Sequence, residues 1–176
     1  MKKVVVYGTH YGTSKTYATW IAESLNCDMY ESKDAKKISF DDYDVVICGG
    51  GLYAGKILGS DILSKYDLSG KNRILFTVGL ADTTLKENID SIKKSVDKFV
   101  DDTSNLKIFN FRGGIDYDKL NMIHRPMMKM LKKMLERKPE SDLTAENREF
   151  IKTFNSKVDF CNKESIKPLL NYVESL

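Results

Sequence analysis

The chain has 176 residues, of which 41% are hydrophobic and 30% charged, and this composition fits one ordinary domain (residues 1–176) with a sizeable core. Three widely spaced cysteines argue against a disulfide framework, and two histidines leave little material for a metal site or for histidine-dependent catalysis. No apolar run approaches the ~20 residues that span a bilayer. The apolar run after Lys3 is too short for a signal peptide, so we expect a cytoplasmic protein. Because histidine and cysteine are few, we expect no bound metal.

The net charge of +3 is distributed unevenly along the chain. Residues 119–138 carry seven Lys or Arg side chains and one acid, Glu136, for a net charge of +6, whereas the remainder of the chain is at −3. This segment is therefore a basic island on a mildly acidic body.

The predicted elements alternate between strands and helices. Continuous apolar runs predict buried parallel strands at 4–8, 43–51, 73–80 and 106–114, and Asp28–Glu31 is a shorter candidate. Apolar residues at spacings of three and four predict helices at 14–25, 56–66, 85–100, 144–161 and 166–173. This alternation predicts an α/β fold, a three-layer, doubly wound sandwich around a five-stranded parallel sheet.

Glycine-containing loops follow four of these strands. They lie at 8–14, 49–55, 79–82 and 113–116. In a doubly wound sheet, ligands bind outside the carboxyl ends of the strands, where these loops meet. The loops are therefore the expected ligand site.

The first loop, GTHYGTS at 8–14, combines glycine with the hydroxyls of Thr9, Thr13 and Ser14 at the start of a helix. Hydroxyls, free backbone N–H groups and the positive end of a helix together favour a phosphate. An ordinary turn with a Ser or Thr cap has the same composition and remains the alternative.

Neither common nucleotide motif fits the sequence. The first loop lacks the third glycine of G-x-G-x-x-G, and the stretch 50–57 approaches a Walker A loop but has Ile57 where a hydroxyl should hold magnesium. The first loop also has no cationic clamp for a triphosphate, so it suits a single phosphomonoester.

The stretch VVYGTHYGTSKTYATWI resembles the flavodoxin signature, with matches at Thr9, Gly12, Thr13 and Ala18 and a serine at Ser14 where that pattern has threonine. The resemblance implies a flavodoxin-like fold that binds FMN. It places the phosphate at Thr9, His10, Tyr11, Gly12, Thr13 and Ser14. It places the isoalloxazine ring at Gly50, Gly51, Leu52, Tyr53, Ala54 and Gly55, and at Val78, Gly79, Leu80, Ala81 and Asp82.

Leu52 and Tyr53 are the expected stacking groups, with Leu80 on the other side of the ring; a half-buried surface aromatic is the alternative for Tyr53. The ring loops carry one cation, Lys56, and one acid, Asp82, on a basic chain. Coulomb's law then predicts easier reduction than in an acidic carrier, and two-electron chemistry.

Residues 116–140 form a basic, methionine-rich insert after the last strand, with five of the seven methionines of the chain. Pro126 suits a first helical turn, and a helix over 126–138 aligns Met127, Met130, Leu131, Met134 and Leu135 in one apolar stripe. One interpretation is a surface helix packed on the core. The other is a lid over the flavin whose methionines adapt to a flat substrate and whose cations attract carboxylates or anionic lipid.

The phosphate loop, VVICGGGLYAGK, FTVGLA and the insert together resemble the menaquinone-dependent protoporphyrinogen IX dehydrogenase branch of flavodoxin-like proteins. The resemblance implies an FMN enzyme at the inner membrane face that oxidises a porphyrinogen and reduces a quinone. The alternatives are a one-electron carrier that docks on a redox protein and an NAD(P)H-dependent quinone reductase. We expect no nucleic-acid partner, and the sequence identifies no catalytic residue.

Overall fold

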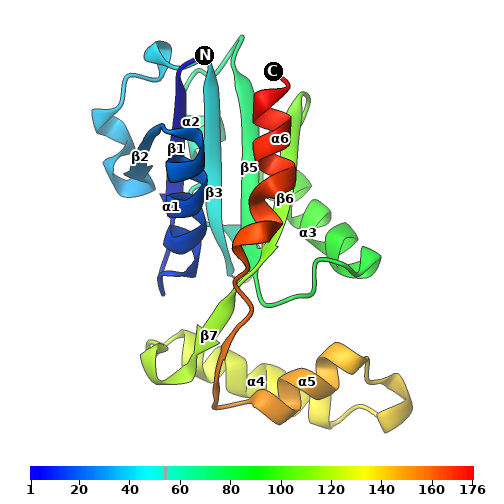
Figure 1. Ribbon diagram of the computed structural model, residues 1–176. Helices are drawn as coiled ribbons and strands as arrows, with labels where there is room; N and C mark the ends of the chain where they lie inside the picture. Colours follow the sequence, from blue (N-terminus) through cyan, green and yellow to red (C-terminus); the bar gives the residue numbers. More distant parts are fainter. Residues whose placement is uncertain (54) are drawn as a thin grey trace.

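The computed structural model describes residues 1–53 and 55–176, and its centre is a parallel sheet (Figure 1). Five strands follow the order β2 (Asp28–Glu31), β1 (Lys3–Gly8), β3 (Val45–Tyr53), β5 (Asn72–Gly79) and β6 (Leu106–Arg112). All four neighbouring pairs are parallel. The predicted α/β class and the five parallel strands are confirmed.

Alternate strand residues pack into two cores because successive side chains point to opposite faces of a sheet. On one face Val5, Ile47 and Ile74 are buried under α1 (Thr13–Leu25) and α6 (Lys167–Glu174). On the other face Val46 and Leu75 are buried under α2 (Ile62–Lys65), α3 (Lys86–Phe99) and the short 3₁₀ helices Ser32–Lys37 and Phe40–Asp42. Figure 1 shows α1 and α6 in front of the sheet, with α2 and α3 behind it.

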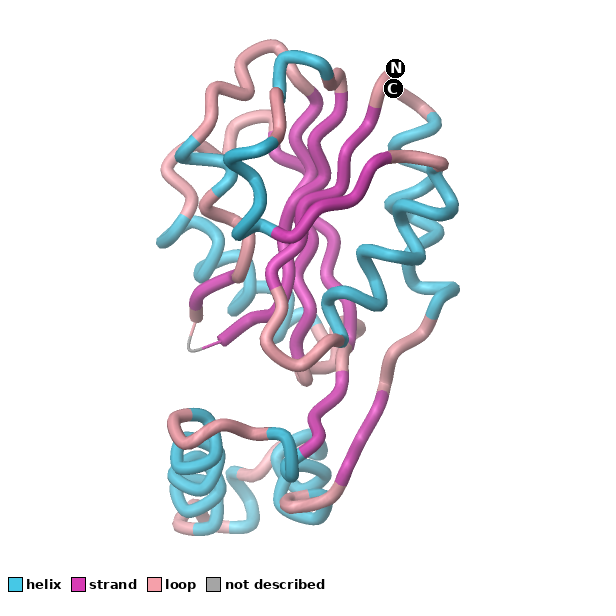
Figure 2. Tube along the Cα trace, turned by 90° about the vertical axis from the view of Figure 1, so that its left-hand side faces the viewer, coloured by secondary structure: helices cyan, strands magenta, loops and turns pink. Residues whose placement is uncertain are grey.

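Residues 114–159, here called the lobe, leave the sheet body at the carboxyl end of β6 (Figure 2). A two-stranded antiparallel ribbon of β7 (Gly114–Asp116) and β8 (Lys157–Asp159) carries the lobe, with Ile115 paired to Val158. Between these strands the chain forms 3₁₀ helices at Tyr117–Lys119 and Glu140–Asp142 and the helices α4 (His124–Glu136) and α5 (Ala145–Thr153). The lobe therefore lies beyond the ends of the strands where the predicted ligand loops meet.

The prediction of a helix at 56–66 is wrong for the first half of this range. Residues Lys56–Ile57 form a short strand, β4, which pairs antiparallel with Leu52 and Tyr53 of β3. This hairpin buries Ile57 in the core and lets Leu58 donate a backbone hydrogen bond to Gly51 at 3.0 Å. Only Ile62–Lys65 are helical.

The helix predicted at 144–161 ends early, at Thr153. Its start is as expected, because the Thr144 hydroxyl accepts from Asn147 N in a capping box. After α5, Asn155 adopts the left-handed conformation with φ 66°, and the chain then extends as β8. Moreover, α5 packs on α4 and belongs to the lobe, so the insert extends over 114–159 and not only over 116–140.

The helix predicted over 126–138 begins two residues earlier, at His124, and ends at Glu136. The expected single stripe is divided between two faces. Leu135 is buried and Leu131 is partly covered, whereas Met130 and Met134 are 64% and 56% exposed. The prediction was wrong on this point because both faces are apolar and the spacing alone cannot tell which one packs.

Candidate functional site

The loop between β1 and α1 ends at the N-terminus of α1, where the first backbone N–H groups have no partner within the helix. Gly12 precedes the helix in the left-handed conformation with φ 97°, which glycine adopts without strain, and no side chain caps the helix. The hydroxyl of Thr9 accepts from Gly12 N at 3.0 Å and so fixes the loop. The first turn of α1 has no acidic residue, so the helix end can attract an anion.

Ser14 provides an independent sign of a ligand. Its side chain is buried, and its Oγ has no hydrogen-bond partner among the described residues. Buried hydroxyls are almost always paired, and an unpaired one costs about 1–3 kcal/mol. A phosphate at this helix end would supply an acceptor close to Ser14, which matches the role expected of the loop.

A polar cavity of about 240 Å³, here called the loop cavity, adjoins this loop. Gly12, Thr13 and Thr16 line one side, and the lobe lines the other side with two lysines, Lys119 and Lys157, and two carboxylates, Asp116 and Asp159. The loop at 8–14 has no Lys or Arg of its own, and these lysines are more than 100 residues away along the chain, so no local pattern reveals them. The lobe thus brings two lysines to the predicted phosphate site together with two carboxylates, and Lys119 Nζ lies 3.8 Å from Asp116 Oδ2.

In the second loop, at 49–55, backbone packing accounts for the glycine at position 50. A Cβ on Gly50 would collide with the carbonyl oxygen of Gly8, because β1 and β3 approach each other closely at their carboxyl ends. Gly50 is therefore needed by the sheet itself, and its presence alone does not indicate a ring.

An apolar cavity of about 150 Å³, here called the central cavity, lies between the sheet ends and α4. The strand ends contribute Leu52 and Tyr53 from β3 and Val78 and Gly79 from β5. Its other walls come from the first loop, the residue after β5 and the lobe: Tyr11, Thr13, Leu80, Gly114, Ile115, Leu120, His124, Met127 and Met128. The predicted phosphate and ring loops thus converge on one cavity, which the lobe covers.

Four aromatic rings gather at this cavity. His124 of α4 stacks on Tyr53, with ring centroids 5.1 Å apart and an interplanar angle of 11°, and its Nδ1 lies 2.5 Å from the Tyr11 hydroxyl. His10 lies 4.9 Å from the Tyr53 ring, and desolvation together with His124 lowers its pKa. Burial raises the pKa of Tyr53 to about 12, so this phenol is neutral at physiological pH. His124 was missed because no sequence signal links α4 to the first loop.

A third, mostly apolar cavity of about 360 Å³ lies between the sheet and the inner faces of α4 and α5; we call it the lobe cavity. Leu52, Gly79, Leu80, Ile115 and Met128 line both this cavity and the central cavity. The two cavities therefore share a wall formed by β3, the loop after β5 and the lobe.

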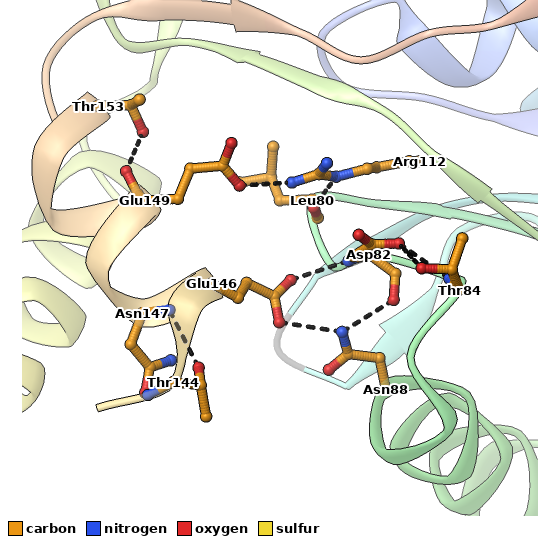
Figure 3. Close-up of polar contacts among 10 residues, drawn as sticks. All are labelled: Leu80, Asp82, Thr84, Asn88, Arg112, Thr144, Glu146, Asn147, Glu149 and Thr153. Carbon is orange, nitrogen blue, oxygen red and sulfur yellow. Dashed lines mark hydrogen bonds and ion pairs between the residues drawn. The ribbon is translucent and has the colours of Figure 1, made fainter. Parts of the chain in front are cut away.

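One cation faces the lobe cavity, and it is already paired. Arg112 donates to Glu149 Oε2 at 2.8 Å and to the Leu80 carbonyl at 3.1 Å, and its guanidinium lies 3.7 Å from the Phe160 ring centroid. Figure 3 shows Arg112 and Glu149 meeting beside Leu80. The charge of Arg112 is therefore already paired with Glu149, and one face of its guanidinium is covered by Phe160.

The predicted site residues are only partly brought together. Eight of them line the central cavity or the loop cavity: Tyr11, Gly12, Thr13, Leu52, Tyr53, Val78, Gly79 and Leu80. Ala81 lines the lobe cavity alone. Thr9, His10, Ser14, Gly50, Gly51, Gly55 and Asp82 line none of them, and Ala54 lies outside the described residues.

The site fits an FMN phosphate and ring. The unpaired Ser14 hydroxyl and the helix end without a side-chain cap match a phosphomonoester, and the adjoining apolar cavity with aromatic walls matches a flat ring. Bound FMN would supply one- or two-electron transfer, while the protein orients the ring and sets its electrostatic surroundings.

Comparison with solved structures gives low similarity to flavodoxin-like proteins. A flavodoxin from Bacillus cereus has 20% identity and a TM-score of 0.43, over 64% of this chain and 84% of that chain. A flavoprotein in complex with FMN from Lactobacillus acidophilus has 12% identity and a TM-score of 0.46, over 63% and 91% of the two chains. A flavodoxin from the Archaea has 19% identity and a TM-score of 0.39, over 68% and 89%.

Among curated proteins, none matches the chain significantly. The family model described as "Flavodoxin domain" does match, over residues 4–142, which is most of the chain. This match includes the predicted phosphate loop, both predicted ring loops and α4, and it confirms the cofactor that the resemblance implied. The chain therefore belongs to the flavodoxin domain family, and its cofactor is FMN.

Proposed function

We propose that the chain is an FMN-dependent oxidoreductase that exchanges electrons with an uncharged, apolar ring compound held under the lobe. The observation that carries this proposal is the lobe cavity of about 360 Å³, which shares a wall with the central cavity. A substrate in it would lie next to a ring held between Tyr53 and Leu80, as electron transfer requires.

The lining of the lobe cavity favours one substrate class. Of the two small molecules that the family resemblance implied, a quinone matches an apolar cavity whose single arginine is paired. A porphyrinogen would have to keep its carboxylates outside, near the lysines of α4. We therefore propose a quinone-like compound as the redox partner in this cavity.

The matched pair Leu131→Trp and Met130→Trp tests the proposal. Leu131 lines the lobe cavity, whereas its neighbour Met130 is 64% exposed on the outer face of α4. Photoreduced holoprotein is mixed with a water-soluble quinone analogue, and reoxidation is followed by stopped-flow absorbance. We expect Leu131→Trp to raise the half-saturating quinone concentration about tenfold and Met130→Trp to leave it within about twofold.

Reoxidation that never saturates with quinone, or an equal response of the two variants, would contradict a quinone site in the lobe cavity. Rapid oxidation by a one-electron protein acceptor, with no saturable quinone reaction, would support the carrier alternative instead.

We also propose that the outer face of α4 contacts an anionic membrane surface. Ile123, Met130 and Met134 follow one another at helical spacing and are 56% to 69% exposed, and Lys129, Lys133 and Arg137 lie beside them. Exposed apolar residues beside a row of cations are typical of helices that lie in a lipid interface. Within residues 1–53 and 55–176, every helix is too short or too polar to span a bilayer.

Co-sedimentation with lipid vesicles tests this contact. We expect binding to vesicles with 30% phosphatidylglycerol, loss of binding in Met130→Glu/Met134→Glu, and no binding to pure phosphatidylcholine at about 0.15 M salt. Equal sedimentation of the wild type and the double variant would contradict it.

A further inference from the structure

Two carboxylates of the lobe are linked to the second predicted ring loop, residues 78–82, which is here called the ring loop. Glu146 and Glu149 lie one turn apart on α5 and point toward the segment 80–88, which connects β5 to α3 (Figure 3). This segment includes Leu80, whose backbone and side chain help to line both the central and the lobe cavities. The lobe and the flavin site are therefore joined by side chains that the sequence analysis did not identify.

Glu146 makes the more specific contact of the two. Its Oε1 accepts from the backbone N of Asp82 at 2.8 Å, and its Oε2 accepts from Asn88 Nδ2 at 2.9 Å. Asn88 Nδ2 also donates to the Asp82 carbonyl at 2.9 Å, so Asp82 is held at both its N–H and its C=O. Both oxygens of the carboxylate are used, whereas a glutamine amide has one acceptor oxygen and would turn its NH2 donor toward the other N–H.

The charge of Glu146 is not explained by an ion pair. Among the described residues, Glu146 has no salt-bridge partner, whereas Glu149 pairs with Arg112 at 2.8 Å. Glu146 is half-buried and lines the lobe cavity. A half-buried carboxylate held only by neutral donors costs desolvation free energy, which its hydrogen bonds to the loop offset.

We propose that Glu146 is a positioning residue for the ring loop: it fixes Asp82, and thereby Leu80, at the distance from Tyr53 that the flavin ring requires. Glu149 supports it indirectly, because Arg112 links Glu149 to the Leu80 carbonyl. FMN binding and lobe docking then depend on each other through this loop. The inference rests on FMN binding at the central cavity.

Three variants test whether Glu146 positions the ring loop or only stabilises the fold: Glu146→Ala, Glu146→Gln and Asn88→Ala. Glu136→Ala is the control. Glu136 is a lobe carboxylate paired with Lys132 on α4, away from the ring loop. Far-UV circular dichroism and thermal melting check that each variant is folded. Should Glu146→Ala fail to fold, Glu146→Gln and Asn88→Ala carry the test, because each keeps part of the network.

The first readout is hydrogen exchange of the apo-protein over residues 79–88. We expect at least about tenfold faster exchange at Asp82 in Glu146→Ala, a smaller effect in Glu146→Gln and Asn88→Ala, and no change in Glu136→Ala. The second readout is FMN affinity from flavin fluorescence quenching. Loss of two charge-assisted hydrogen bonds is expected to raise the Kd about tenfold or more in Glu146→Ala, and Glu146→Gln should recover most of it because it still accepts from Asp82 N.

A third readout is the midpoint potential of the bound flavin. Glu146→Ala and Glu146→Gln both remove a negative charge near the ring, so both should raise the potential, whereas only Glu146→Ala should weaken binding strongly. Unchanged exchange, Kd and potential in Glu146→Ala would overturn the positioning role while wild-type FMN binding still stands. A wild-type protein that does not bind FMN would instead overturn the proposed function, and the exchange measurement on the apo-protein would still be informative.

Discussion

Ser14 is the residue whose environment depends most directly on a phosphate. Its hydroxyl is buried without a partner among the described residues, at the first turn of a helix without a side-chain cap. In the apo-protein this unpaired hydroxyl lowers the stability of the fold, whereas in the FMN complex it would donate a hydrogen bond to a doubly charged phosphate. The two states should therefore respond to its removal in opposite directions.

We predict that Ser14→Ala raises the Kd for FMN about tenfold or more, since a hydrogen bond to a charged group is worth about 1.5–3 kcal/mol. The apo-protein should lose no stability, because the variant removes an unpaired buried polar atom. Fluorescence titration with FMN and urea unfolding of the apo-protein measure the two effects.

The exposed Ser64, whose hydroxyl donates to Asp61 O, provides the control variant Ser64→Ala. Unchanged FMN affinity in Ser14→Ala, or a loss of apo stability larger than in the control, would show that the Ser14 hydroxyl does not face the phosphate.

At the scale of elements, α4 shows what a sequence pattern can and cannot resolve. The spacing of its methionines and leucines correctly indicated a helix, and Pro126 lies in its first turn. However, α4 is apolar on more than one face, and only contact with α5 and the strand ends decides that Leu135 is buried and Met134 is not. Adjacent residues of similar size therefore have different roles.

We predict that Leu135→Ala lowers the free energy of unfolding by about 2–4 kcal/mol through the cavity that it leaves. Met134→Ala should change it by less than about 0.5 kcal/mol, because an exposed side chain loses little on truncation. Urea unfolding followed by circular dichroism measures both variants. Similar losses of unfolding free energy in the two variants would contradict the packing of α4 through its Leu135 face.

For the whole molecule, the sequence predicts the sheet, but of the lobe it predicts only the insert with its helix α4 and the start of α5. Strands such as Val45–Tyr53 are continuous apolar runs because both faces of a parallel sheet are covered, and this pattern is visible in the sequence. β7 and β8 have three residues each, partly polar, and they pair over more than 40 positions, so no local pattern reveals them. The predicted site residues lay on the sheet loops for the same reason, whereas Lys119, His124 and Glu146 come from the lobe.

We expect the phosphate of FMN to bind at the first loop and its ring to bind under the lobe. Titration of the apo-protein with FMN and, in parallel, with riboflavin tests it most directly, because riboflavin has the same ring and lacks the phosphate. We predict quenching of flavin fluorescence by both ligands, with FMN bound about 100-fold or more tightly than riboflavin. Absence of quenching by FMN, or equal affinity for the two ligands, would contradict the account.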